Sequence, residues 1–181
     1  LKKEGFSWGD CINPSEKDFQ TLEKYTKIHS KIIKDALSTR ERPKVIPTSG
    51  GSVVIINAPI KTEKGLRLTP VVMIILKKEV ITIHNYEVIA INELLSQNSE
   101  KKLAYFGKNV TDLTFTLFDE ILKDFFRAID EIEDNLEDIE KKLLESKEDN
   151  IIKDIFEVKK TLIFFHKALT ANREVINDIE K

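Results

Sequence analysis

The chain is poor in the features that mark secreted, membrane-spanning or nucleic-acid-binding proteins. Its 181 residues include one cysteine, Cys11, which excludes an internal disulfide and fits a reducing compartment. The longest apolar run, Val71 to Leu76, is far shorter than the roughly 20 residues that cross a bilayer. The net charge of −2 gives no reason to expect a nucleic-acid partner, which would favour a basic face.

The two ends also lack features that a natural start and stop would show. The first five residues contain neither an initiator methionine nor the apolar segment of a signal peptide. The helical pattern near the C-terminus continues up to Lys181. We therefore expect the chain to be a fragment of a longer protein. At 41% hydrophobic residues, it can bury the core of one domain plus an additional arm.

The last third of the sequence predicts an antiparallel helical hairpin with a coiled-coil seam. Two apolar series alternate spacings of four and three residues, which keeps each series on one stripe of a helix. The polar residues 146–150 separate them, and so short a connection favours two helices that face each other. A third helix is expected from about Asn172. The two series are Phe125, Ile129, Ile132, Leu136, Ile139 and Leu143, then Ile151, Ile155, Val158, Leu162, Phe165 and Leu169.

The residues up to about Arg40 are predicted to be helical. Asn13 is the expected N-cap of a first helix, with Pro14 at its first position. A second short helix is expected to follow, with an apolar face that points inward. That face consists of Ile28, Ile32, Ile33, Ala36 and Leu37.

The residues from Val45 to about Tyr86 predict a sheet. Runs rich in β-branched residues at 53–56, 71–76 and 80–83 are typical of strands. Gly50-Gly51 and residues 57–65 are expected to interrupt them, and residues 77–79 form a tight connection. A short helix is expected at 89–95. The predicted fold class is α+β, a mixed α/β sandwich domain followed by the long helical hairpin.

No pattern of catalytic residues is present, so the chain is not predicted to be an enzyme. The histidines are scattered, and Gly50-Gly51 lacks the following Lys-Ser/Thr of a phosphate loop. The segment from Asp119 to Asp149, however, contains 13 acidic and five basic residues, which gives it a net charge of about −8. These carboxylates are either a solvated helix face or oxygen ligands for a divalent ion such as Mg²⁺. Asp119 lies beside the apolar pair Leu117-Phe118, before the coiled-coil stripe begins.

Several stretches together resemble the cytoplasmic domain of CorA-type magnesium transporters. Each is modestly specific, but they occur in the family's order over nearly the whole chain. They are Trp8, Asn13-Pro14, residues 27–29, 32–37, 42–45, 117–126 and 162–175.

The resemblance implies the cytoplasmic, ion-sensing domain of a homopentameric divalent-cation channel in the plasma (inner) membrane. It divides the chain into an α/β sensor domain at 1–105, the helical hairpin at 106–170, and the start of a stalk helix at 171–181. The stalk would lead to membrane helices and a Gly-Met-Asn signature that are absent from this sequence. In such proteins regulatory Mg²⁺ binds between neighbouring subunits and favours the closed pore. Co²⁺ and Ni²⁺ are further permeant ions.

Two of the family's sensing carboxylates match positions in this sequence, namely Asp35 and Asp119. A third belongs to the neighbouring subunit's stalk. The chain departs from the family pattern at Lys34, where relatives can have a second acid, which puts a second metal position in doubt. It departs again at Ala171, where relatives often have proline, so the break before the stalk is expected to be gentler.

Two alternatives stay open at the level of sequence. The zinc-transporting branch of the same family shares this architecture. A free-standing protein-interaction module would instead use the helical hairpin to dock a partner, and it would predict an apolar patch outside the seam and no response to millimolar Mg²⁺.

Overall fold

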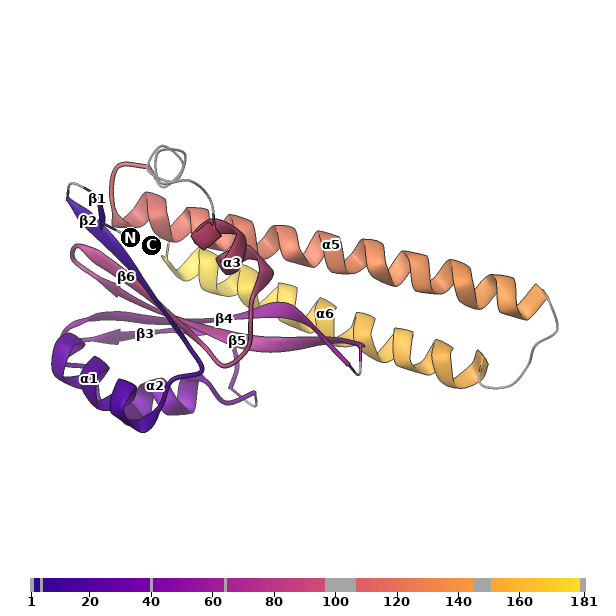
Figure 1. Ribbon diagram of the computed structural model, residues 1–181, viewed down its shortest axis with the longest axis horizontal. Coiled ribbons are helices and arrows are strands. Elements are labelled where there is room, and N and C mark those ends of the chain that lie inside the picture. The colour runs from indigo at the N-terminus through magenta and orange to yellow at the C-terminus, as the bar shows by residue number, and fades with distance from the viewer. Residues whose placement is uncertain are drawn as a thin grey trace.

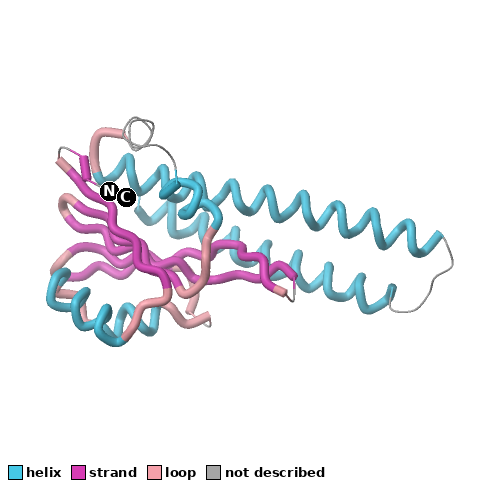
Figure 2. Tube along the Cα trace, viewed as in Figure 1, coloured by secondary structure: helices cyan, strands magenta, loops and turns pink. Residues whose placement is uncertain are grey.

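A six-stranded sheet with helices on both faces forms the body of the molecule, and two long helices extend beyond it (Figures 1 and 2). The computed structural model describes residues 2–3, 5–39, 41–63, 65–96, 107–144 and 151–179. In chain order the elements are β1 (Lys2–Lys3), β2 (Phe6–Ile12), α1 (Glu16–Thr26), α2 (Ser30–Ala36), β3 (Lys44–Thr48), β4 (Gly51–Thr62), β5 (Gly65–Leu76), β6 (Glu79–His84), α3 (Ile89–Ser96), α5 (Val110–Leu144) and α6 (Ile151–Ile179).

The sheet is mixed, and its strand order is β1-β2-β6-β5-β4-β3. The β2–β6 pair is parallel, and every other neighbouring pair is antiparallel. Helices α1 and α2 cover one face, while α3, α5 and α6 cover the other (Figure 1). The predicted α+β fold class, with its β5–β6 hairpin and the short helix near residue 89, is confirmed.

The central strands bury side chains on both faces. In β4, Val54 and Ile56 enter the core beneath α3, α5 and α6, whereas Val53 and Ile55 enter the core beneath α1 and α2. Successive side chains of a strand point to opposite faces, so a sheet covered on both sides needs unbroken apolar runs. This requirement explains why the strands read as continuous β-branched stretches in the sequence.

The N-terminal segment is a strand, so the prediction of helix throughout the first 40 residues is wrong for residues 6–12. β2 pairs in parallel with β6, with Trp8 opposite Val80. Phe6 and Trp8 alternate with more exposed neighbours and are 4% and 2% exposed. This alternation is short, and the partner strand lies more than 70 residues away, so local pattern alone did not reveal the pairing.

Helix α1 begins two residues later than predicted. The N-cap is Ser15, whose hydroxyl accepts the backbone N–H of Asp18, while the Asp18 carboxylate accepts the backbone N–H of Ser15. This reciprocal arrangement is a capping box, which satisfies two backbone donors that a helix start leaves open. Asn13, the predicted N-cap, instead has a left-handed backbone (φ 48°) in the turn that leaves β2. The inward face predicted for α2 is confirmed for Ile33 and Ala36.

Strand β4 runs through Asn57 and Pro59, where an interruption was predicted. β3 pairs with β4 only from Gly51 to Ile55, so the rest of β4 has one strand neighbour, β5. The side chain of Asn172 bonds both backbone groups of Asn57 on the free side, at 2.9 Å each. Pro59 lies two residues further, so its missing N–H falls on this same free side, where no strand requires it.

The predicted antiparallel helical pair is present as α5 and α6 (Figure 1). Phe125 and Phe165 meet edge to face, with ring centroids 5.5 Å apart. The predicted connection at 146–150 lies outside the described residues. The separate helix expected from Asn172 is wrong, because α6 is continuous from Ile151 to Ile179 and has no proline to break it. None of the described helices is long and apolar enough to span a membrane.

Asn172 joins the second long helix to the sheet and is 1% exposed. Replacing it with alanine removes both hydrogen bonds to the strand edge, and we expect the free energy of unfolding to fall by about 2 kcal/mol. Urea denaturation measures this change. Asn92→Ala is the matched control, because Asn92 is exposed on α3 and its replacement should cost less than about 0.5 kcal/mol. Equal effects of the two changes would contradict the role given to Asn172.

A buried histidine joins β6 to β2. His84 is fully buried; one ring nitrogen lies 3.1 Å from Asp10 Oδ1 and the other 2.6 Å from the carbonyl oxygen of Tyr86. Thr82 links the same carboxylate to the indole N–H of Trp8, which donates to the threonine hydroxyl. Burial by itself lowers the pKa of His84, but the hydrogen bond and charge of Asp10 outweigh it, so the pKa is raised.

This raised pKa predicts a pH-dependent stability. The folded protein binds the proton more tightly than the unfolded chain, so the stabilisation is complete below about pH 6.5, the ordinary histidine value, and is lost as the pH rises through the folded-state pKa. We expect urea denaturation between about pH 6 and pH 9 to show this decline. Asp10→Asn should flatten it, and His166→Gln, which changes an exposed histidine, should not. Parallel profiles for all three proteins would contradict the assignment.

Candidate functional site

Asp35 lies near the end of α2 with its side chain exposed. His29 is the N-cap of this helix, and its ring Nδ1 accepts the backbone N–H of Lys31 at 3.1 Å. Ile33 and Ala36 anchor its inner face in the core. Because residues 33 and 36 face inward, Asp35 is directed outward, with its carboxylate open to solvent.

The neighbouring Lys34 contacts α1. Its ammonium group forms an ion pair with Glu16 at 2.6 Å and lies 5.2 Å from the centre of the Phe19 ring. The positive charge of Lys34 is therefore held against α1 by a carboxylate and an aromatic ring.

Asp119 lies on the exposed side of α5. Its carboxylate is 2.8 Å from the ammonium group of Lys123, one turn further along the helix. Leu117, Phe118 and Ile121 are buried against the sheet. Asp119 thus belongs to a face that points away from the core, and its nearest charge partner is itself exposed.

The structure does not bring Asp35 and Asp119 together within one chain. α2 and α5 cover opposite faces of the sheet (Figure 1). In the part of the chain that the structure describes, no group of three or more His, Cys, Asp or Glu side chains is placed to hold a metal ion. Each predicted ligand therefore offers one outward carboxylate, and a complete site needs oxygen atoms from elsewhere.

One carboxylate of the acidic helix has an internal role that the sequence did not reveal. Asp124 is 3% exposed and accepts the backbone N–H of Ala90 at 2.8 Å, at the start of α3. Arg127 bonds Asp124 at 2.9 Å and Glu93 at 2.8 Å. Burial raises the pKa of Asp124, opposed by the Ala90 hydrogen bond and the Arg127 charge. Asp124 therefore joins α5 to α3 and is not a free metal ligand.

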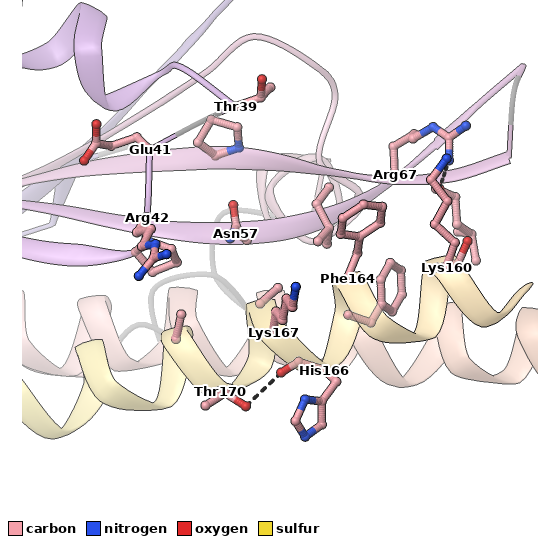
Figure 3. Close-up of a pocket in the computed structure, with 18 of the residues that line it drawn as sticks. Thr39, Glu41, Arg42, Asn57, Arg67, Lys160, Phe164, His166, Lys167 and Thr170 are labelled. Atoms are coloured by element: carbon pink, nitrogen blue, oxygen red, sulfur yellow. Dashed lines mark hydrogen bonds between the residues drawn. The ribbon is translucent and has the colours of Figure 1, made fainter. Parts of the chain in front are cut away.

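A basic groove lies between α6, the β4–β5 strands and the loop before β3 (Figure 3). Its volume is about 920 Å³, and Arg42, Arg67, Lys160 and Lys167 are among the residues that line it. These residues are far apart in the sequence and form no motif, so sequence reasoning missed the groove. Only the packing of α6 across the free edge of β4 brings them together.

Comparison with known proteins identifies the family. The model of the CorA-like Mg²⁺ transporter protein family matches residues 3–181. The chain therefore belongs to this family. It is 30% identical over 170 residues to the cobalt/magnesium transport protein CorA of Methanocaldococcus jannaschii, an alignment that covers 93% of this chain and 53% of the relative. The chain thus spans about half the length of that curated relative.

Solved structures show the same architecture. The soluble domain of CorA from Methanocaldococcus jannaschii superposes with a TM-score of 0.86 and 29% identity, covering 96% of this chain and 70% of that one. The cytoplasmic domain of ZntB from Vibrio parahaemolyticus superposes with a TM-score of 0.70 over 95% of this chain and 68% of that one. At 15% identity, this second likeness shows the fold alone.

The internal role of Asp124 can be tested by stability measurements. Asp124→Ala leaves the Ala90 N–H buried without a partner, and we expect the free energy of unfolding to fall by about 2–3 kcal/mol. Asp124→Asn retains an acceptor oxygen and should cost less. Asp138→Ala, on an exposed part of the same helix, should change stability by less than about 0.5 kcal/mol. If Asp124→Ala were as mild as Asp138→Ala, the proposed link to α3 would be wrong.

Proposed function

We propose that this chain is the cytoplasmic regulatory domain of a channel that carries Mg²⁺, and that it senses the same ion. The observation that carries the proposal is the family match over residues 3–181, joined to the fold of a CorA soluble domain. The name of the curated relative adds cobalt as a second transported ion. We propose the channel to be a homopentamer, anchored in the plasma (inner) membrane by segments outside this sequence.

Asp35 and Asp119 are the proposed regulatory ligands. In a ring of identical subunits, each subunit meets its two neighbours through different surfaces. The two carboxylates face outward from opposite layers of the molecule, so each can contribute to a site that a neighbouring subunit completes. Mg²⁺ prefers oxygen ligands and retains several waters, so one or two carboxylates from each side are sufficient.

The proposed regulation follows from charge. Without the ion, carboxylates of adjacent subunits repel each other, and a divalent ion between them converts this repulsion into attraction. A conformation that brings the subunits together therefore binds Mg²⁺ more tightly, and the ion shifts the population toward it. We propose that this Mg²⁺-bound conformation is the closed channel. Loss of Mg²⁺ from the cytoplasmic side would then favour opening.

The test uses the full-length gene product in lipid vesicles, with ion influx followed by a fluorescent indicator. We expect Mg²⁺ on the cytoplasmic side to inhibit influx, and Asp35→Asn to require at least a several-fold higher Mg²⁺ concentration for half-inhibition. Asp119→Asn should act in the same direction. Glu133→Gln is the matched control, because Glu133 is exposed on the same long helix as Asp119 and its loss should leave the inhibition unchanged.

Each part of the proposal has its own contradicting result. Influx without inhibition by Mg²⁺ would remove the sensing role. Inhibition that is unchanged by both aspartate substitutions would remove the site assignment while leaving transport intact. Influx of Zn²⁺ in preference to Mg²⁺ and Co²⁺ would favour the zinc-transporting branch. No influx of any of these ions would favour the interaction module.

A further inference from the structure

The basic groove has the size and boundaries of a small-molecule site. Its volume of about 920 Å³ lies within the range of about 300–1,000 Å³ that is typical of ligand pockets. One wall is the middle of α6, from Lys160 to Glu174, and the other is formed by β4, β5 and the loop residues Thr39, Glu41, Arg42 and Pro43. Asn172 holds these walls at a set separation through its two hydrogen bonds with the edge of β4.

Positive charge dominates this groove, although the chain as a whole is slightly acidic. Four cationic side chains from three segments line it: Arg42, Arg67, Lys160 and Lys167. Two carboxylates also line the groove. Glu41 is paired with Lys44 at 2.5 Å, so Glu174 is the one carboxylate that can offset the positive charge of the groove. Within the described part of the chain, neither Arg42 nor Lys167 forms an ion pair, and Lys160 has only a distant one with Glu157 at 4.0 Å. Like charges directed into one concavity repel each other unless an anion is present.

The side chains in Figure 3 converge from both walls. Lys160 extends from α6 toward Arg67 on β5, and Lys167 extends from the same helix toward Asn57 on β4. Within the residues that the structure describes, the Arg67 guanidinium forms no ion pair and donates one long hydrogen bond, at 3.3 Å, to the carbonyl oxygen of Leu66. Its planar donors are thus available for bidentate contacts, which suit the oxygens of a phosphate group.

An exposed aromatic ring lies among these cations. Phe164 is 48% exposed and lines the groove, whereas its neighbour Phe165 is 3% exposed and packs against Phe125 of α5. Leu68 and Pro70 add apolar surface on the facing strand. The groove therefore combines several phosphate-type donors with a flat apolar surface against which a planar ring can stack.

We infer that this groove binds an organic polyphosphate with a planar ring, of the class of nucleoside diphosphates and triphosphates. The phosphates lie among Arg67, Lys160 and Lys167, and the ring lies against Phe164. This ligand is an anion and its site does not include Asp35 or Asp119, so the inference does not depend on the proposed metal-sensing role.

The test is calorimetric titration of the purified chain with ADP and ATP at low ionic strength, with EDTA present to exclude divalent ions. We expect saturable binding to one site that weakens as salt is added, because the contacts are ionic. The double variant Arg67→Gln/Lys167→Gln should weaken binding at least tenfold. The control Lys153→Gln/Lys159→Gln removes the same charge from exposed positions of α6 outside the groove and should change affinity less than twofold.

Simpler probes separate the two halves of the site. Pyrophosphate should bind more weakly than ADP, and Phe164→Ala should weaken ADP binding several-fold while leaving pyrophosphate binding unchanged. Thermal melting of each variant verifies that it is folded. Pyrophosphate binding as tight as that of ADP would overturn the assignment of the ring. Absence of nucleotide binding, equal losses in both double variants, or preferential binding of an acidic peptide would overturn the site.

Discussion

The burial of both faces of the β4–β5 hairpin is the constraint on which the rest of the molecule depends. Val54 and Met73 enter one core while Val53 and Val72 enter the other. A shift of either strand by one residue would exchange every side chain between the two cores. Because α1 and α2 occupy one side and α3, α5 and α6 the other, this register determines which helices can pack where, and therefore which residues become exposed.

The β4–β5 hairpin also extends beyond β3, and this extension connects the sheet to the two long helices, α5 and α6. Leu66 and Leu68 of β5 pack into the cluster that includes Phe125 and Phe165, and Lys61 forms an ion pair with Glu131 at 2.8 Å. The free edge of β4 receives Asn172 in place of a neighbouring strand. The long helices are therefore attached to the sheet at several points along the β4–β5 hairpin.

The acidic residues of α5 divide by depth into two groups. Asp124 is buried and paired, and it joins two helices of the same subunit. Asp119 and the acids from Asp130 to Glu140, except the half-buried Glu131, face solvent, where an exposed carboxylate contributes little to the stability of its own chain. Asp119, with Asp35 on the opposite layer, therefore stays the proposed pair of ligands for a divalent ion, whereas the buried and paired Asp124 is not a candidate.

Local signals in the sequence determined the fold class, the strand cores at residues 53–56, 71–76 and 80–83, and the long helical pair, because periodicity and β-branched runs reflect burial directly. The family resemblance supplied Asp35 and Asp119 as metal ligands, an assignment that stays a prediction. Tertiary structure alone decided that residues 6–12 form a strand, since its partner is distant in the chain, and that β4 continues through Pro59, since only the missing neighbour makes proline tolerable there. It likewise decided the burial of Asp124 and the convergence of four cations at one groove. These features depend on contacts between residues that are far apart in sequence, and no local pattern encodes them.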